Sequence, residues 1–335
     1  MPVYNGDQYL REAIDSILNQ DFTDFEFVII DDGSDDESLQ IIRSYTDSRI
    51  RLIIHDSNQG LIRTLNEGLV EARGELIARM DCDDICHPNR LDKQVAFMDQ
   101  QPQVGVCGTW FELMPSRQQI KHPESDAAIK VGLLKHSMIG HPTAVIRKSI
   151  LEKYNLYYNA SYPHAEDYAF WVACARHTRL ANIPEVLLWY RQHEQQISQK
   201  YAMIQEQTTD KILAELIGEL GIVPMCHDLD FHKSIVIKQS LHLSRVFMEG
   251  AYLWIFKLKQ ANKKYKKFEE PYFSELFSFY ERQLNQFRKQ RFSISSEFSS
   301  GIALEFYLSP LKHYRHFGWK YSLKFLLKFF PINKK

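Results

Sequence analysis

Short apolar runs alternate with amphipathic helical segments through the first third of this chain, and that alternation limits its fold more than any other feature. The apolar runs cover residues 25–30, 50–54, 76–80 and 104–110. Helical spacing of apolar residues marks the segments between them, at residues 10–18, 36–45, 61–73 and 90–101. Strands and helices that alternate with short connections predict an α/β fold with a mostly parallel sheet covered on both faces.

Two of the predicted strands end in carboxylates. Asp31 and Asp32 follow the run at 25–30, and Asp81, Asp83 and Asp84 follow the run at 76–80. Ligands of α/β proteins bind beyond the carboxyl ends of the strands. Asp81 and Asp83 project to one side of an extended backbone, where their charges repel unless a cation lies between them. The pattern predicts a divalent metal that carries a diphosphate; the alternative is a solvated acidic loop.

Composition excludes several classes of protein. The chain has 335 residues, 44% of them hydrophobic and 25% charged, as in ordinary globular proteins, and its length allows more than one domain. A net charge of −1 gives no general attraction to nucleic acid. The five scattered cysteines suit a reducing compartment. The sequence shows neither a signal-peptide pattern nor a transmembrane run, so we expect a cytoplasmic protein.

Four short segments in order resemble the family 2 glycosyltransferases over about residues 1–200. They are Pro2-Val3-Tyr4-Asn5, Asp31-Asp32-Gly33-Ser34, Asn58-x-Gly60-Leu61 with Asn66-x-Gly68, and Ala78-Arg79-Met80-Asp81-x-Asp83-Asp84. Each is weak alone, and their collinearity makes the resemblance specific. It implies a GT-A (nucleotide-diphospho-sugar transferase) Rossmann-like fold and an inverting transfer of sugar from a nucleoside diphosphate.

The resemblance also implies roles for donor-site residues. Asp32 would accept a hydrogen bond from the nucleotide base, which suits uracil, although an Asp before Gly33 also stabilises turns. Pro2, Val3 and Tyr4 would pack around base and ribose. Asp81 and Asp83 would hold Mn²⁺ or Mg²⁺ and the ribose beside the diphosphate. Arg79 would lie near the phosphates or pair with an acidic neighbour.

Two later segments resemble the acceptor half of the family. Glu166 and Asp167 match a carboxylate pair at a helix start, where one acts as base; we expect Asp167 in this role and Glu166 second, the alternative being a helix-capping pair. Arg191 and His193 match a Tyr-Arg-x-His segment, alternate onto one side of an extended chain, and would cover the diphosphate. Their alternative is a polar surface turn.

The N-terminus departs from the family pattern. The family's first strand precedes the Pro-Val-Tyr-Asn segment, and here residues 1–6 read as a turn followed directly by a helix. Because the loss of a central strand would leave buried backbone groups unpaired, we expect the functional polypeptide to have about ten more residues upstream.

The region from about residue 201 reads as helical, so we expect domains at 1–200 and 201–335. Lysines mix with aromatic residues at 253–267, and residues 311–335 contain seven Lys or Arg and no Asp or Glu. Such basic amphipathic helices lie on anionic membranes, although this one could instead dock on the catalytic domain. Basic aromatic segments also bind nucleic acid, but no nucleic-acid fold is visible, and we expect no such partner.

These observations favour an enzyme that moves a sugar from a donor such as a UDP-sugar to a hydroxyl on a glycan or lipid-linked acceptor. The setting would be cell-surface polysaccharide synthesis at the inner face of the cytoplasmic membrane, with peripheral attachment. A sugar nucleotidyltransferase is a rival, but it would need a Gly-rich basic loop near the start. A non-catalytic, membrane-associated assembly protein is another, and the retained carboxylates argue against it.

Overall fold

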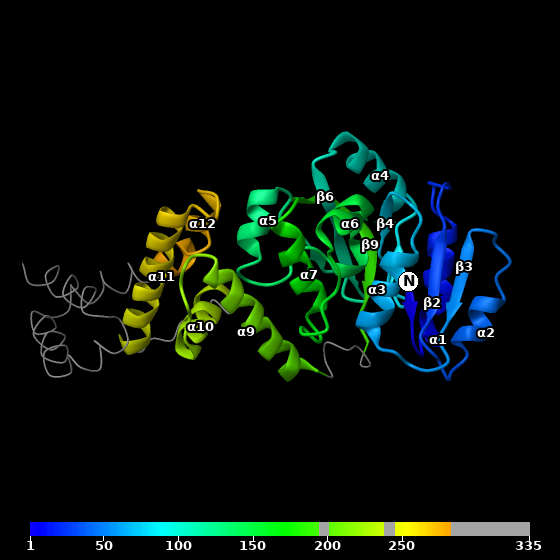
Figure 1. Ribbon diagram of the computed structural model, residues 1–335, viewed down its shortest axis with the longest axis horizontal. Coiled ribbons are helices and arrows are strands. Elements are labelled where there is room, and N and C mark those ends of the chain that lie inside the picture. The colour runs from blue at the N-terminus through cyan, green and yellow to red at the C-terminus, as the bar shows by residue number, and fades with distance from the viewer. Residues whose placement is uncertain (194–200, 238–244, 283–335) are drawn as a thin grey trace, which may run out of the picture. The chain divides into compact units, whose positions relative to one another are not determined.

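The computed structural model describes residues 1–193, 201–237 and 245–282, and Figure 1 shows its helices and strands. Met1–Phe277 form one compact unit. The division into domains at residue 200 therefore remains a prediction. The membrane-binding tail predicted at 311–335 lies outside the described residues.

A three-stranded parallel sheet forms the N-terminal part, in the order β1-β2-β3. Its strands are β1 (Pro2–Val3), β2 (Phe27–Asp31) and β3 (Ile50–Ile54). The helices that connect or follow them are α1 (Asp7–Leu18), α2 (Ser38–Arg43) and α3 (Leu61–Glu71). These elements agree with the predicted alternation to within a few residues at each end.

Residues 1–6 differ from the predicted turn. Pro2 and Val3 pair in parallel with Ile30 and Asp31, and the Asp32 N–H donates to the Val3 carbonyl at 2.8 Å. The turn prediction was wrong for these two residues, because backbone pairing with a buried neighbouring strand overrides a local pattern.

The second sheet is mixed, in the order β4-β8-β6-β9-β5, with β7 paired to β6. Its strands are β4 (Leu76–Ala78), β5 (Ile85–Cys86), β6 (Val104–Met114), β7 (Gln119–Ile120), β8 (Val145–Arg147) and β9 (Arg179–Arg191). β6 and β9 are parallel, whereas β4 pairs antiparallel with β8. The sequence places both acidic strand ends on one sheet, but the structure divides β2 and β4 between two.

Helices and a shared core join the sheets. The helices of this part are α4 (Arg90–Gln100), α5 (Asp126–Gly132), α6 (Lys148–Tyr154) and α7 (Glu166–Ala175), with a 3₁₀ turn at His141–Thr143. One hydrophobic cluster contains Leu10 and Ile14 of α1, Ile29 of β2, Met80 of the loop after β4 and Leu188 of β9. Burying such side chains is the main favourable term in folding, so the two acidic loops are held by one core.

The described residues after 201 are helical, as predicted. They form α9 (Ala202–Gly218), α10 (Cys226–His232), a π-helical turn at Lys233–Ile237, α11 (Arg245–Tyr265) and α12 (Tyr272–Glu275). Among the helices that the structure describes, none combines the length and apolar character that a bilayer crossing requires.

Candidate active site

The loop after β4 gathers three carboxylates at one point. One ligand oxygen from each of Asp81, Asp83 and Asp84 lies within 4.8 Å of the others. Burial, and then the charges of the two neighbours, raise the pKa of Asp84 well above its ordinary value. Asp84 is 1% exposed, and its Oδ2 has no hydrogen-bond partner among the described residues. A buried, unpartnered carboxylate oxygen among like charges fits a hard divalent cation, whose preferred ligands are oxygens.

Arg79 is the buried cation closest to this loop. Its guanidinium pairs with Asp81, while its Nε has no partner among the described residues. The arginine is 8% exposed, and the opposing charges of Asp81, Tyr158 and Asp84 outweigh its burial and raise its pKa. The pairing with an acidic neighbour is thus present, and the Nε–H of the guanidinium remains available as a hydrogen-bond donor.

Arg191 and His193, at and just beyond the end of β9, reach the same loop. The Arg191 N–H donates to Asp84 Oδ1 at 2.9 Å, and its Nε donates to the Asp83 carbonyl at 2.9 Å. His193 Nε2 lies 2.9 Å from Asp83 Oδ2. Both side chains lie against Tyr9, with the guanidinium 4.3 Å from the ring centroid and the imidazole 5.3 Å from it. The two residues therefore brace the acidic loop rather than form an isolated surface turn.

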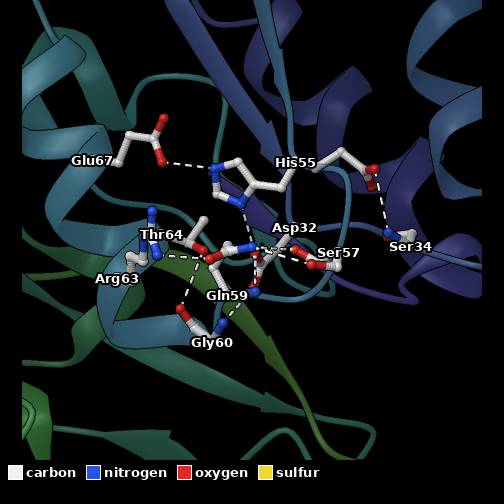
Figure 2. Close-up of polar contacts among 10 residues, drawn as sticks. Asp32, Ser34, His55, Ser57, Gln59, Gly60, Arg63, Thr64 and Glu67 are labelled. Atoms are coloured by element: carbon white, nitrogen blue, oxygen red, sulfur yellow. Dashed lines mark hydrogen bonds and ion pairs between the residues drawn. The ribbon is translucent and has the colours of Figure 1, made fainter.

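Asp32 lies in a different environment, shown in Figure 2. Its Oδ1 accepts from the Gln59 N–H at 2.8 Å and lies 2.7 Å from His55 Nδ1, and its Oδ2 accepts from the Gly60 N–H at 2.9 Å. The side chain is only 3% exposed. Three donors occupy most of the lone pairs of one carboxylate, so Asp32 holds the loop that leads into α3.

His55 and Glu67 extend this network, and the sequence reading missed both. His55 Nε2 lies 2.7 Å from Glu67 Oε2, so the imidazole sits between two carboxylates. The hydrogen bond to Asp32 raises the pKa of His55, and that to Glu67 adds to the shift. The available signal was the position of His55 directly after β3, which neighbours β2 in the parallel sheet.

The neighbouring Asp31 was not singled out from Asp32 by sequence. It is 1% exposed, and its Oδ2 accepts from the Ser34 N–H at 3.3 Å. Its Oδ1 has no partner among the described residues. Of the two carboxylates at this strand end, Asp31 therefore has the greater unused hydrogen-bonding capacity.

The N-terminal loop joins the two acidic ends. Asn5 donates its N–H to Ser34 Oγ at 3.1 Å, which ties it to the loop after β2. A Cβ added at Gly6 would come within 2.9 Å of Cys82 Sγ, so glycine allows close contact with the acidic loop after β4. Of the predicted base-packing residues, Val3 is 1% exposed and belongs to the core, whereas Tyr4 is 48% exposed.

Glu166 and Asp167 form the first turn of α7. Burial, and then the charge of Asp167, raise the pKa of Glu166 to about 7. Burial also raises the pKa of Asp167, while the Arg79 charge opposes that shift. Because Arg79 and Asp81 influence both carboxylates, the structure brings the start of α7 and the acidic loop into one electrostatic site.

Tyr158 and His141 line this site and carry no motif in the sequence. His141 Nε2 lies 2.9 Å from the Tyr158 hydroxyl, and its ring meets Trp171 edge-on. Burial, and then the Arg79 charge, lower the pKa of His141 well below its ordinary value. The imidazole is therefore neutral at pH 7, and its ring packs against Trp171 of α7.

A mixed α/β fold with carboxylate clusters beyond its strand ends is the architecture of the GT-A glycosyltransferases. The family model described as "Glycosyl transferase family 2" matches residues 1–155. A glycosyltransferase of Haemophilus influenzae is 32% identical over 260 residues, which cover 72% of this chain and 79% of the relative. This chain belongs to the family 2 glycosyltransferases, and it is a transferase.

Two further comparisons agree. The Escherichia coli O-antigen biosynthesis glycosyltransferase WbnJ is 31% identical over 232 residues, covering 66% of this chain and 89% of that protein. Residues 1–349 of TarS from S. aureus, solved in complex with UDP-GlcNAc, match with a TM-score of 0.58 and 17% identity. That match covers 84% of this chain and 90% of the other, and at this identity it supports the fold alone.

Proposed function

We propose that the chain transfers a sugar from a nucleoside diphosphate donor, a UDP-sugar by preference, to a hydroxyl group of a glycan or lipid-linked acceptor. The product would contribute to cell-surface polysaccharide. The name of the E. coli relative, an O-antigen biosynthesis enzyme, supports the pathway class. TarS, which shares the fold, was solved with UDP-GlcNAc, and we propose the same donor class for this chain.

One observation carries this proposal: the acidic loop and the start of α7 share one electrostatic environment around Arg79. Asp81 and Arg79 both influence the pKa of Glu166 and of Asp167. A transferase needs a place for the departing diphosphate and a base for the incoming hydroxyl on opposite sides of one sugar carbon. The carboxylates of the acidic loop and those at the start of α7, both under the influence of the buried Arg79, would supply both.

Asp167 acts as the base in this proposal, with Glu166 as the second candidate. The acceptor oxygen forms a bond to the sugar C1 as the bond from C1 to the diphosphate oxygen breaks, and the hydroxyl proton passes to the carboxylate. Attack opposite the leaving group inverts the configuration at C1. Asp81, Asp83 and Asp84 would hold Mn²⁺ or Mg²⁺, which supplies positive charge to the leaving diphosphate.

The remaining predicted residues bind the donor. Pro2, Val3 and Tyr4 border the base and ribose, Val3 through its backbone since its side chain is buried. Asp32 fixes the adjacent loop and has little capacity left for a base N–H. Asp31, with an unpartnered oxygen, is the alternative acceptor for that contact.

Arg79 and Arg191 supply the positive charge for the diphosphate, and His193 lies beside them as a hydrogen-bonding group. Arg79 has an unpartnered Nε, and the other two residues hold the acidic loop from the side of β9.

A donor panel tests the function. The enzyme is incubated with UDP-, GDP- and TDP-sugars in the presence of Mn²⁺ or Mg²⁺, and nucleoside diphosphate release is measured. We expect metal-dependent release from UDP-sugars that EDTA abolishes. Release of inorganic pyrophosphate from a nucleoside triphosphate and a sugar phosphate would instead identify a nucleotidyltransferase.

A pair of variants tests the assignment of the base. Asp167→Asn keeps the size of the side chain but removes the base, and we expect kcat for transfer to fall about 10²–10⁴-fold while donor binding is retained. Glu166→Gln is the matched comparison, and its kcat should fall less than that of Asp167→Asn. A larger loss in Glu166→Gln would reassign the base to Glu166.

Peripheral attachment to the inner face of the cytoplasmic membrane is a separate proposal. It rests on the basic, amphipathic pattern of residues 311–335, which gives lysines for anionic headgroups and apolar residues for the interface. Flotation with anionic liposomes should recover the full chain, and a chain that ends at residue 310 should stay in the dense fraction. Equal flotation of both chains would reject this role for the tail.

A further inference from the structure

A cavity of about 800 Å³ lies among α5, α11 and the segment between α11 and α12, apart from the carboxylate site. Figure 1 shows these helices in green, yellow and orange. Five lysines line the cavity: Lys130, Lys259, Lys263, Lys266 and Lys267. The lining also holds three carboxylates, those of Asp126, Glu269 and Glu270, so the cavity has a surplus of positive charge. The glycosyltransferase mechanism uses none of these residues.

The C-terminal end of α11 is fixed in a defined conformation at this cavity. Asn262 is 3% exposed, donates from Nδ2 to the Phe268 carbonyl at 2.9 Å, and accepts from the Phe268 N–H at 2.8 Å. The Lys266 N–H donates to the Asn262 carbonyl at 2.7 Å, and Lys266 takes a left-handed φ of 50°. Phe268 is buried beneath the turn. The lysines are thus presented by an anchored backbone, which favours a binding site over a random charge run.

The lysines differ in their partners. Lys130 pairs with Asp126 at 2.9 Å, and Lys267 pairs with Glu219 at 2.5 Å. Lys263 and Lys266 are exposed and make no ion pair or hydrogen bond through their ammonium groups with any described residue. Two ammonium groups at one cavity wall repel each other, and an anion between them relieves that repulsion.

A simpler explanation is that the lysines complement the C-terminal dipole of α11. That effect reaches only the last turn of a helix. It accounts for Lys263 and for Lys266 and Lys267 just beyond the helix end, but not for Lys130, which lies on α5, nor for Lys259, which lies more than one turn before that end. The helix dipole therefore does not explain why lysines from separate segments converge on one cavity.

We propose that this cavity binds the phosphate groups of a small soluble ligand, at a site separate from the donor diphosphate. Lysine is a compact point charge on a flexible stem, which suits phosphate oxygens of variable geometry. The cavity volume admits a pyrophosphate or a phosphorylated sugar. The carboxylates of Glu269 and Glu270 at the wall disfavour a flat anionic membrane and favour a discrete phosphate that can avoid them.

Amine labelling with and without pyrophosphate tests the site directly. The full chain is treated with a limiting acetylating reagent in EDTA, and the modification of each lysine is read by mass spectrometry. We expect pyrophosphate to slow the labelling of Lys263 and Lys266 at least about threefold, and to leave Lys257 unchanged. Lys257 is the matched internal control, since it lies on α11 but contacts Asp228 and Trp254 outside the cavity.

Calorimetric titration with pyrophosphate in EDTA supplies the second measurement. The double variant Lys263→Gln, Lys266→Asn should bind about tenfold more weakly, and Lys257→Gln should bind like the wild type. Asn is chosen at position 266 because it tolerates a left-handed backbone. The donor site is intact in all three proteins, so nucleoside diphosphate release without the cavity's ligand should be equal.

Three results would overturn the proposal. They are equal pyrophosphate affinity in the double variant and the wild type, equal labelling of Lys263 with and without pyrophosphate, and protection by phosphatidylglycerol vesicles but not by pyrophosphate. The last would show that the lysines contact a membrane surface. Because each measurement is independent of catalysis, failure here would leave the proposed glycosyltransferase reaction unaffected.

Discussion

Two acidic strand ends of this glycosyltransferase look alike in sequence and differ in their physical state. Asp32, after β2, is surrounded by donors from Gln59, Gly60 and His55. The loop after β4 instead crowds three carboxylates within 4.8 Å and leaves Asp84 Oδ2 without a partner among the described residues. The first is satisfied by the protein itself, and the second is incomplete without added positive charge.

The two sites make opposite contributions to the stability of the ligand-free protein. A buried carboxylate with full hydrogen bonding stabilises the fold, since the loss of one partner leaves the others unsatisfied. In the loop after β4, burial and then the like charges of Asp81 and Asp83 raise the pKa of Asp84, so the ionised cluster destabilises the same fold. A bound cation offsets this repulsion, and the free energy gained adds to the affinity for the cation. The comparison predicts opposite signs for substitutions at the two sites.

Asp83→Asn should have the largest effect on activity. The variant removes one carboxylate from the cluster while it keeps the size of the side chain, and we expect metal-dependent nucleoside diphosphate release to fall about 10³-fold or more. The metal-free protein should be as stable as the wild type or more so, because repulsion decreases. Mn²⁺ at 100 times its Kd should stabilise the wild type by about 2.7 kcal/mol and the variant much less, as measured by thermal unfolding.

Asp99→Asn is the control for this experiment, since Asp99 is an exposed carboxylate on α4. It should behave like the wild type in both measurements. Equal stabilisation of Asp83→Asn and wild type by Mn²⁺ would show that the cluster is not where the cation binds.

Asp32→Ala should give the opposite sign in stability. It leaves the N–H groups of Gln59 and Gly60 and the Nδ1 of His55 without the buried carboxylate that binds them, so we expect the free energy of unfolding to fall by about 2–4 kcal/mol. Urea denaturation measures the change, and Asp24→Ala, at an exposed position, is the control. A loss below about 0.5 kcal/mol, together with weakened donor binding, would instead support a direct contact of Asp32 with the base.

The sequence was sufficient to predict the helices and strands, but not the hydrogen-bond partners of the site residues or the pairing of the strands. Apolar periodicity located α1, β2, β3, α3 and the acidic loop, because these depend on local pattern and burial. It could not show that the N–H groups of Gln59 and Gly60 fill the carboxylate of Asp32, since that contact joins residues 27 and 28 positions apart. The division of β2 and β4 between sheets was missed for the same reason: strand pairing is a long-range choice.

Burial also explains why the sequence could not decide the roles of other residues of the site. Tyr158 and His141 were not predicted as a pair, because nothing local marks a hydrogen bond across 17 residues. The carboxylates of Glu166 and Asp167 were found only through a family resemblance. Their raised pKa values depend on surrounding walls that a single sequence does not display.

Glu166→Gln should have a smaller effect, and it depends on pH. The folded-state pKa of Glu166 is raised from 4.5 to about 7, so the folded protein holds this proton more tightly than the unfolded chain. The contribution to stability is greatest below about pH 4.5 and is lost as the pH rises to about 7. At pH 8 we expect the variant to be about 1–3 kcal/mol more stable than the wild type, and at pH 4 about equal. A stability difference independent of pH would show that ionisation of Glu166 is not the cause.

Gly6→Ala should produce the smallest change, and it tests whether the two acidic loops are mechanically joined. The new Cβ would lie 2.9 Å from Cys82 Sγ, which forces a local shift and should cost about 1 kcal/mol. In a Cys82→Ala background the nearest contact of the new methyl group becomes the Cβ of residue 82 at 3.7 Å, an ordinary distance, so the cost should nearly vanish. A double-mutant cycle therefore gives a coupling of about 1 kcal/mol when the loops pack as described. Additive effects of the two substitutions would mean that Gly6 and Cys82 are not in close contact. The N-terminal loop would then have no direct influence on the position of the carboxylate cluster.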